Sequence, residues 1–509
     1  MSFRRLGWVA AIALATLLEI SCGQVYRPVV IPTGTTPPNP ADFHAVFAVS
    51  ANVPYNPGTA LQIDVSGDSD IGAANMGVNP THAAIVPNNS RVFVASAGSL
   101  FTGDADVVMA FTPASDSSTA TGLGTPTTFT LPYGSQPVFV NTTQTSAVYV
   151  ANYGTNSVSA LNTATNAISL TAGVGVNPVG LAETPNGQNL YVLNQGSNTV
   201  SDLSPTDLSL LATIPVGSIP TWVVSRIDGL RVYVVTQGDG QLTTIRTDTN
   251  AIVSTQSVGG PGANFVLYDK SLNRLYVTNP TAGAVYVFSA ATDPPTPLGS
   301  ATGALSIPAP TVTASLSSVC GTYTCTYSAP LPVSVAALPD GSRFYVTSYV
   351  TGTATAASVP ATCPDATVTV PGCIIPQVTV FDAPSLTLKT TIFPLMPPLN
   401  AIIGTTPTTL YPFGLAPVAY CAPVVPYTPA FARFRMSAAA AVDSSRVYAS
   451  MCDGGAIAIV NTTTSTISTG ETNTPDTLVT DLVAPFSAGN PQLNGEPLPQ
   501  NPIFLLTGQ

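Results

Sequence analysis

A unit of about 42 residues repeats along the chain and constrains its fold more than any other feature. The clearest copy runs from Gly175 to Val216 and contains four short apolar or Ser/Thr-rich segments, separated by turn residues such as Pro185-Asn186-Gly187. The copies before and after it match it position by position. Four strands in a repeat of this length predict an all-β fold, a β-propeller, whose four-stranded blades surround a central channel.

An aromatic residue in the second segment of each repeat marks the repeats along the rest of the chain. These landmarks are Phe47, Phe93, Tyr149, Tyr191, Tyr233, Tyr276, Tyr345 and Tyr448, with successive gaps of 46, 56, 42, 42, 43, 69 and 103 residues. Eight landmarks predict eight blades, and seven is the alternative because the ends of the chain are harder to assign. We expect the landmark side chains to form the core of the blades rather than to bind a ligand.

The two ends of the chain are expected to meet in one blade. The first landmark, Phe47, has no apolar segment before it other than the N-terminal tether, whereas residues 477–483 look like a first strand without partners. Placing both in one blade closes the ring and removes exposed strand edges. The tail at 502–506 could add a further strand to this closing blade.

The second segments resemble the YVTN-type repeat of exported bacterial and archaeal surface propellers. The resemblance is carried by residues 275–279 (Leu-Tyr-Val-Thr-Asn), 149–152 (Tyr-Val-Ala-Asn) and 198–201 (Asn-Thr-Val-Ser). It is good over roughly 130–290 and looser elsewhere. It implies an exported propeller of seven or eight blades. It implies no single activity, because related propellers serve as surface-layer parts, binding scaffolds and lactonase-like enzymes.

The N-terminus has the features of an export signal. Arg4 and Arg5 precede an apolar run over residues 6–18, and small residues follow it near Cys22. This order is typical of a secretory signal peptide, and the apolar run is too short for a comfortable membrane span. Residues 1–21 are therefore predicted to be a signal peptide, residues 22–41 a Pro/Thr-rich tether and residues 42–509 the propeller.

Cys22 directly follows Ser21 and resembles the lipidated cysteine of bacterial lipoproteins, which becomes the mature N-terminus. Glu19 departs from that pattern, because a large aliphatic residue usually stands three positions before the cysteine. The resemblance implies a lipid anchor at Cys22, and the alternative is ordinary cleavage that leaves a plain cysteine. The expected location is a membrane-anchored lipoprotein of the periplasm or the cell surface.

Charged residues make up only 8% of the chain, and the formal net charge is −11. The basic surface that a nucleic-acid partner requires is missing, and so are the charge-rich helices of coiled coils. Beyond the signal, no run of apolar residues is long enough to span a membrane. Contact with a membrane is therefore expected only through the lipid anchor.

Six cysteines remain after Cys22, and an even number in an exported chain indicates disulfides. A zinc site would need paired C-x-x-C motifs or histidine partners, which the sequence lacks. Six cysteines can pair in many ways, so the connectivity stays open. Closeness in sequence suggests the pairs Cys320–Cys325, Cys363–Cys373 and Cys421–Cys452.

Side chains that could bind a metal or catalyse a reaction are few. Asp64, Asp68 and Asp70 could offer oxygen ligands to Ca²⁺, but they fall between the third and fourth strands of one blade, where a solvated turn is the commoner use. Asp104 and Asp106 present a similar case on another loop.

The two histidines, His44 and His82, lie at the starts of apolar segments. We expect each to be a hydrogen-bonded histidine of the core or rim rather than a base. Phosphate-binding and nucleophile motifs do not occur in a fitting context. We therefore assign no catalytic residue, no cofactor and no metal ligand, with Ca²⁺ as the one open possibility.

Residues beyond the minimal blade gather in a few loops, near 309–330, 351–376 and 397–435, with a smaller one at 95–106. These loops connect either the fourth strand of a blade to the next blade or the second strand to the third. Both kinds of connection emerge on the same face of a propeller. The opposite face is expected to keep tight turns throughout. Five of the six paired cysteines lie in these loops and Cys452 lies in the loop adjacent to that of Cys421, which predicts an ordered surface for recognition.

This surface favours the interpretation that the protein is a binding or scaffold protein of the cell envelope, whose partner is an envelope protein, a peptide or a glycan. One alternative is an enzyme of lactonase or lyase type with its site at the channel mouth, and another is a surface-layer subunit. The predicted contact residues are Tyr349, Tyr411, Tyr420 and Tyr427 on the loops, and Asn152, Asn194, Gln237 and Asn279 near the channel mouth.

The lipid anchor is directly testable. Wild-type protein should partition into the detergent phase, and Cys22→Ala should release it, because the substitution removes the only thiol that the lipoprotein pattern designates. The measurement is Triton X-114 partitioning followed by immunoblotting. Recovery of the wild-type protein wholly in the soluble fraction would contradict the anchor.

Overall fold

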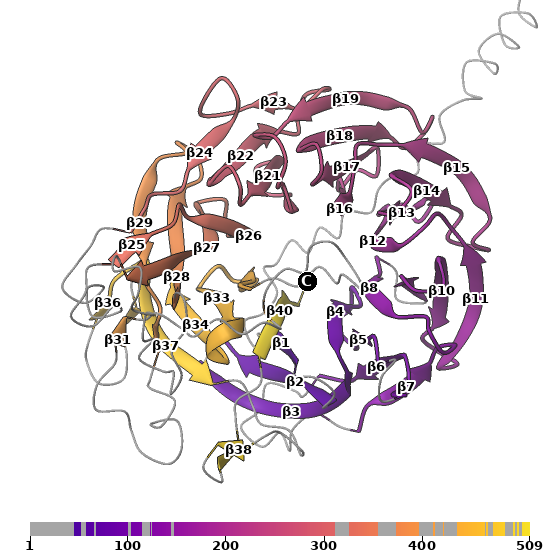
Figure 1. Cartoon of the computed structure of the whole chain (residues 1–509), viewed down its shortest axis with the longest axis horizontal. Helices are drawn as coiled ribbons and strands as arrows, with labels where there is room; N and C mark the ends of the chain where they lie inside the picture. Colours follow the sequence, from indigo (N-terminus) through magenta and orange to yellow (C-terminus); the bar gives the residue numbers. More distant parts are fainter. Residues whose placement is uncertain are drawn as a thin grey trace, which may run out of the picture. The chain divides into compact units, whose positions relative to one another are not determined.

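Eight antiparallel sheets follow one another around a ring, which confirms the predicted eight-bladed β-propeller (Figure 1). All the described residues belong to one structural unit, Asn39–Gln509. The computed structural model describes residues 45–51, 57–65, 68–99, 103–113, 123, 125–143, 147–310, 325–354, 373–396, 411–412, 421, 435–463, 465–466, 472–483, 492–493, 496–497 and 501–508.

Blades 1 to 4 each use four consecutive strands, which are named in order from the channel outward. Blade 1 contains β4 (Pro80–Ile85), β5 (Val92–Ser96), β6 (Val107–Phe111) and β7 (Thr127–Thr130). Blade 2 contains β8 (Pro137–Asn141), β9 (Ala147–Asn152), β10 (Ser157–Asn162) and β11 (Ala167–Gly173). Blade 3 contains β12 (Pro178–Glu183), β13 (Leu190–Asn194), β14 (Thr199–Leu203) and β15 (Leu210–Pro215). Blade 4 contains β16 (Pro220–Ser225), β17 (Arg231–Thr236), β18 (Gln241–Arg246) and β19 (Ile252–Ser257).

Blades 5 and 6 carry additional short strands, whereas blade 7 has four strands. Blade 5 contains β20 (Phe265–Asp269), β21 (Arg274–Asn279) and β22 (Ala284–Ser289), and both β23 (Thr296–Pro297) and β24 (Ala304–Ser306) pair with β22. Blade 6 contains β26 (Leu331–Ala337), β27 (Arg343–Ala354), β28 (Cys373–Asp382) and β29 (Leu388–Ile392), and β25 (Cys325–Tyr327) pairs with β27. Blade 7 contains β32 (Ala438–Ala440), β33 (Arg446–Met451), β34 (Ala456–Asn461) and β37 (Thr477–Val483).

Blade 8 joins the two ends of the chain, as the sequence predicted. Its order is β40 (Asn501–Thr507), β1 (Ala45–Ala51), β2 (Pro57–Asp64) and β3 (Ser69–Val78). The prediction for residues 477–483 was wrong in detail. They form the outer strand of blade 7, paired with β34, and the C-terminal tail supplies the inner strand that pairs with β1.

The position of each strand in its blade explains its composition. The inner strands pack against those of the two neighbouring blades around the channel, and their residues are mostly buried. All eight landmark aromatics are at most 2% exposed, which confirms them as core residues. The outer strands β11, β15 and β19 consist mainly of exposed and half-buried residues, because they lie at the outer edge of the blade.

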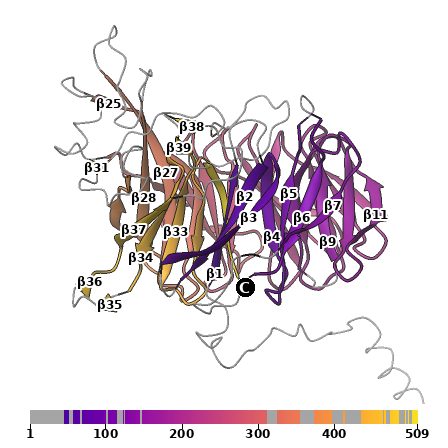
Figure 2. The same ribbon diagram turned by 90° about the horizontal axis from the view of Figure 1, so that it is seen from below.

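The connections divide between two faces of the ring. We name the face with the second-to-third and fourth-to-first connections the loop face, and the opposite one the turn face. The turn face is not tight throughout, contrary to expectation: residues 462–476 join β34 to β37 there and include β35 (Ser465–Thr466) and β36 (Thr472–Asn473). Strand β1 begins and β40 ends at the turn face (Figure 2).

Much of the elaborated loop face lies outside the described residues, including most of the predicted insertions at 309–330, 351–376 and 397–435. Described elements in these regions are β25, the far ends of β27 and β28, and two short strands, β30 (Leu395–Met396) and β31 (Tyr411–Pro412), which pair with each other. A further hairpin, β38 (Gln492–Leu493) with β39 (Glu496–Pro497), precedes β40. Within the described residues, no helix is both long and apolar enough to cross a bilayer.

Closure of the ring by β40 generates a prediction. Deleting residues 501–509 should lower the free energy of unfolding by at least about 3 kcal/mol. The deletion removes the buried side chains of Ile503 and Leu505, which contribute about 1.5–3 kcal/mol each, and leaves the β1 edge free to pair with other molecules. Deletion of residues 508–509 alone is the matched control. Size-exclusion chromatography and urea unfolding measure both effects, and a monomer of unchanged stability would contradict this role of β40.

Candidate functional site

Aromatic side chains from the inner strands meet across the central channel. The ring of His82 stacks on that of Phe139 with centroids 3.7 Å apart, and Phe504 approaches His82 to 4.3 Å. Trp222 lies 5.4 Å from Phe139 and 5.0 Å from Phe265. These residues belong to blades 1, 2, 4, 5 and 8. Since blades 1 and 4 are not neighbours, the contact of His82 with Trp222 crosses the channel.

The inner strands place these side chains by a shared local irregularity. In blades 1, 2 and 4 the strand begins with a proline, and the pairing register shifts between that proline and the residue two positions on. That second residue is His82, Phe139 or Trp222. In blade 3 the corresponding residue is Gly180, which adds no side chain. The bulge therefore directs the side chain of one residue per strand toward the channel, and the size of that side chain determines how much of the channel it occupies.

His82 is a packing residue of this aromatic cluster. Burial lowers its pKa to about 3, against the opposing effect of a hydrogen bond with the backbone of Val140. The imidazole is therefore uncharged at neutral pH and stacks as an aromatic ring. This agrees with the core role expected for His82, whereas His44 lies outside the described residues.

Three of the four amide residues predicted near the channel mouth are buried and bonded within the ring. Asn152 and Asn194 sit at the ends of second strands, and each donates to two hydroxyls of the following strand, Ser157 and Ser159 or Thr199 and Ser201. The exposed fraction of each is at most 1%.

Asn279 is equally buried and donates to the carbonyl oxygens of Val258 and Gly260 in the preceding connection. Gln237 is half-buried, and its backbone N–H donates to Ile219 O. Contact of these four residues with a ligand stays a prediction.

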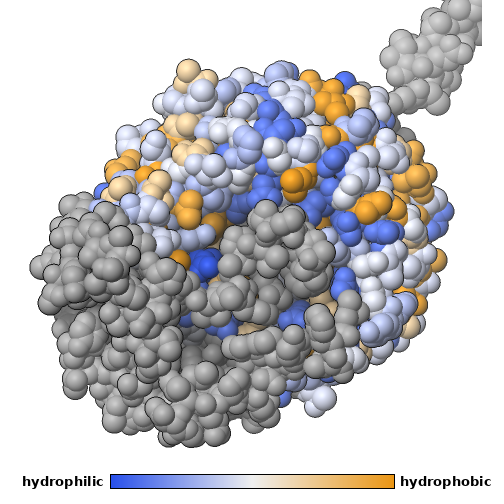
Figure 3. Space-filling view, viewed as in Figure 1, coloured by the Kyte–Doolittle hydropathy of each residue, from blue (hydrophilic) through white to orange (hydrophobic). Residues whose placement is uncertain are grey.

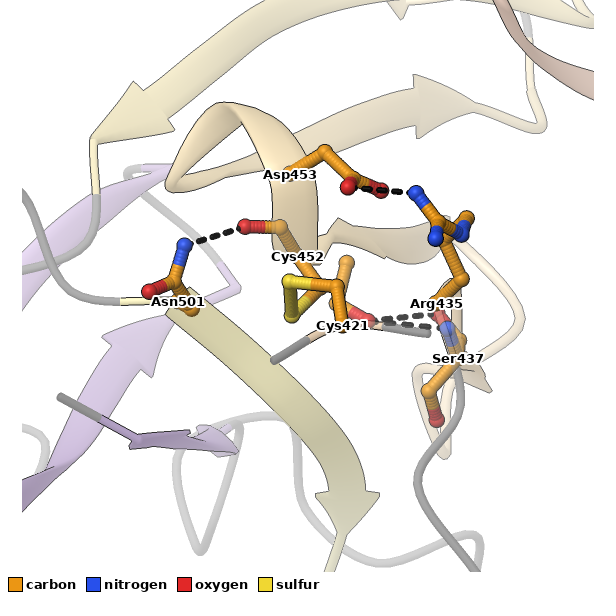
Figure 4. Close-up of a disulfide and its surroundings, with 7 residues drawn as sticks. Cys421, Arg435, Ser437, Cys452, Asp453 and Asn501 are labelled. Carbon is orange, nitrogen blue, oxygen red and sulfur yellow. Dashed lines mark hydrogen bonds and ion pairs between the residues drawn. A yellow bond between two sulfur atoms is a disulfide. The ribbon is translucent and has the colours of Figure 1, made fainter. Parts of the chain in front are cut away.

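A disulfide and a buried ion pair lie on the loop face of blade 7, where Tyr349 of blade 6 and Asn501 of blade 8 contact them. Figure 4 shows the disulfide, the ion pair and Asn501. We call this arrangement the disulfide platform; it consists of Tyr349, Cys421, Arg435, Cys452, Asp453 and Asn501. Cys421 and Cys452 are bonded with a Cα–Cα distance of 5.7 Å, which confirms the last of the three suggested pairs. The pair closes a loop of 31 residues.

The charged and polar side chains around the disulfide form ion pairs and hydrogen bonds within the protein. Arg435 forms an ion pair with Asp453, and the two side chains are only 7% and 1% exposed. The guanidinium also lies over the ring of Tyr349, 5.2 Å from its centroid. Asn501 Nδ2 donates to Cys452 O at 2.6 Å, which ties the closing strand to the platform. Burial raises the pKa of Tyr349, so its hydroxyl stays protonated.

The other predicted loop residues are described in part. Tyr411 lies in β31, Cys325 in β25 and Cys373 at the start of β28. Residues predicted by sequence that lie outside the described part of the chain are Cys22, Cys320, Cys363, Tyr420 and Tyr427.

Two of the aspartates considered for Ca²⁺, Asp68 and Asp106, have structural contacts. Asp68 pairs with Arg446 of blade 7 at 3.0 Å, so it joins blades 7 and 8. Asp106 is buried, its pKa is raised by desolvation, and it accepts hydrogen bonds from backbone N–H groups of 134–136. Among the described residues, no group of three or more His, Cys, Asp or Glu side chains is placed to hold a metal ion.

The aromatic cluster and the Arg435–Asp453 pair were missed by the sequence reasoning. A signal for the cluster exists: Pro80, Pro137 and Pro220 are each followed two positions later by an aromatic or imidazole ring. The ion pair had no such signal, because Arg435 and Asp453 come from different connections and meet only in the folded ring.

Comparisons with known proteins add a likeness of fold. No family model matches the chain, and no curated protein matches it at a significant level. Solved structures that resemble it include Kuenenia stuttgartiensis hydrazine synthase, with 16% identity, 65% of this chain and 77% of that chain covered, and a TM-score of 0.42. A putative 6-phosphogluconolactonase from Bacteroides fragilis has 14% identity, coverage of 69% and 95%, and a TM-score of 0.46. The WD40 domain of Toxoplasma gondii coronin has 10% identity, coverage of 49% and 66%, and a TM-score of 0.42.

The energetic role of the platform's ion pair is testable by substitution. Asp453→Asn should lower the free energy of unfolding by about 3 kcal/mol, because it leaves the buried Arg435 guanidinium without its counter-ion. The matched control is Asp248→Asn in the pair with Arg246, whose side chains are 54% and 45% exposed; it should cost less than about 1 kcal/mol. Urea unfolding measures both. Equal losses in the two variants would show that burial of the platform pair has no energetic consequence.

Proposed function

We propose that the protein is an exported, lipid-anchored propeller that acts as a binding or scaffold protein of the cell envelope. Its contact surface is the loop face of blades 6 to 8, and its partner is an envelope protein, a peptide or a glycan. The observation that carries this proposal is a strand extension of blade 6 that rises beyond the ring.

Strands β27 and β28 are twelve and ten residues long, about twice the length of their counterparts in blade 3. Their pairing continues without a register shift from Arg343–Asp382 to Gly352–Cys373. Strand β25 pairs with the far end of β27, with Cys325 opposite Ala354. Figure 2 shows β25 and these strand ends projecting from the ring on the loop face. Backbone pairing of three strands supports an ordered projection rather than a loose loop.

The disulfide platform lies on the same face, because Cys452 and Asp453 belong to the connection between β33 and β34. A disulfide and a buried ion pair hold it together, and it contacts blade 6 through Tyr349 and blade 8 through the Asn501 side chain. A rigid surface loses less conformational entropy on binding than a mobile one. Beside the grey atoms in Figure 3, the residues near the centre of the ring are mainly hydrophilic, which suits hydrogen bonding to a peptide or a glycan next to this surface.

The aromatic cluster also favours the loop face over the channel. Rings from five blades meet in the channel at the level of His82 and Trp222, which leaves less space for a ligand there. Export is supported by the disulfide, since such bonds persist mainly in oxidising compartments.

The test removes the extension and spares the ring. Deletion of residues 353–374 leaves Thr351-Gly352 as a two-residue turn after Val350, which already pairs with Ile375. We expect the variant to keep the circular dichroism and melting of the ring and to lose at least about tenfold in affinity for envelope fragments of the producing cells, measured by co-sedimentation. Digesting the fragments with protease beforehand separates a protein partner from a glycan.

The matched control deletes residues 465–473, which include β35 and β36 on the turn face. It should leave co-sedimentation unchanged. Undiminished binding of the 353–374 deletion, or loss of binding only in the control, would overturn the proposed contact surface.

A further inference from the structure

A pocket of about 460 Å³ lies between blades 2 and 3, toward the turn face and away from the proposed contact surface. Its size falls within the range of small-molecule sites in proteins. One wall consists of strand residues of blade 2, and the other of Glu183 and two turns of blade 3. The lining residues that the argument uses are Ala147, Tyr149, Ala160, Leu170, Glu183 and Pro205.

The interface between blades 3 and 4 shows which side chains are missing from the interface between blades 2 and 3. Between blades 3 and 4, Asp202 Oδ2 accepts hydrogen bonds of 2.8 Å from both Asn189 Nδ2 and Asn250 Nδ2. Tyr191 completes the network, because its hydroxyl donates to Asn250 Oδ1 at 2.8 Å. Three polar side chains and a tyrosine thus occupy that interface.

A shift of 42 residues toward the N-terminus replaces all three polar side chains with apolar ones. Asn189, Asp202 and Asn250 become Ala147, Ala160 and Leu208. The strand pairing confirms this equivalence, because Ala160 lies opposite Tyr149 as Asp202 lies opposite Tyr191. Leu208 and Asn250 both occupy left-handed positions, with φ of 57° and 56°. The tyrosine is retained, but Tyr149 donates to Pro205 O at 3.0 Å instead.

The carboxylate of Glu183 lies on the other wall of the pocket, opposite the positions where apolar residues replace polar ones. Glu183, at the end of β12, is 1% exposed. Its Oε2 accepts a hydrogen bond from the Thr143 backbone N–H at 2.9 Å, and the Thr143 hydroxyl also lies close to the carboxylate. Its Oε1 is buried and receives no hydrogen bond of good geometry. A buried carboxylate oxygen without a donor is costly, so a donor brought by a ligand would stabilise it. None of the lining residues is a lysine or an arginine that could supply that donor.

We propose that this pocket binds a small primary organic amine. The ammonium group donates to Glu183 Oε1, and the carbon skeleton lies against Tyr149, Ala160 and Leu170. A cation suits the site better than a neutral donor, because pairing with an ionised carboxylate gives a stronger hydrogen bond. The overall charge of −11 also favours the approach of a cation.

The site should depend on pH in a defined direction. Burial raises the pKa of Glu183, against the hydrogen bonds from Thr143. The carboxylate that pairs with the amine is present above this raised pKa and is lost as the pH falls through it. Amine affinity should therefore decline on acidification earlier than the ordinary pKa of glutamate, 4.5, would imply.

The test compares n-pentylamine with its neutral counterpart n-pentanol, titrated into the full-length mature protein by isothermal calorimetry. We expect pentylamine to bind about tenfold or more tightly than pentanol, the difference that one charge-assisted hydrogen bond contributes. Glu183→Gln keeps the shape of the side chain and should abolish both the preference for the amine and its pH dependence. Equal binding of the two compounds to the wild type, or no binding of either, would overturn the proposal.

Two further variants separate ligand binding from structural effects. Ala160→Leu fills the pocket from the opposite wall and should weaken pentylamine binding about tenfold or more, whether or not Glu183→Gln folds. Asp202→Asn removes a buried carboxylate from the filled interface and should leave pentylamine binding unchanged. An Ala160→Leu protein that binds pentylamine as the wild type does would contradict the site.

Discussion

Antiparallel pairing between β1 and β40 is the interaction on which the rest of the structure depends. A propeller blade is not stable alone, since both faces of its sheet need a neighbouring blade to cover them. The pairing runs from Val46–Thr507 to Ala51–Asn501 and turns eight sheets into a ring in which every blade has two neighbours. It also places Phe504 against His82 in the channel and Asn501 against Cys452 on the loop face. One strand thus contributes to the closure, to the aromatic cluster and to the disulfide platform. Blade 8 is complete only when residues 501–507 pair with β1.

The repeat made the fold predictable, because each copy carries its own strands, turns and core aromatic residue. Tyr149, Tyr191 and Tyr233 follow one another at intervals of 42, and each packs in the second strand of its blade. Prediction was weaker where the copies stop being regular. Residues 477–483 are as apolar as a first strand, and only the long connection at 462–476 shows that they belong to the outside of blade 7. The local sequence of residues 477–483 does not distinguish an inner strand from an outer one, because a short apolar strand is compatible with either position.

The sites were predicted less well than the fold, for a physical reason. The sequence indicated where loops gather and which cysteines could pair, because loop length and cysteine spacing are local properties. It did not indicate what meets across the ring. Arg435 and Asp453 are 18 positions apart in irregular segments, and Glu183 faces strands that belong to the preceding repeat. Equivalent positions of adjacent blades differ in the side chains that fill the interface between blades: Asp202 occupies one interface and Ala160 the equivalent place in the other. The strand register is needed to establish that these two positions are equivalent.

The position of Ala45 has a consequence for how the molecule is presented. Strand β1 begins at the turn face, so a chain segment that leads to it from Cys22 joins the ring on that side. The strand extension of blade 6 leaves the ring on the loop face, so the point where the chain enters the ring and the proposed contact surface lie on opposite faces. The pocket between blades 2 and 3 lies toward the same face as the entry of the chain.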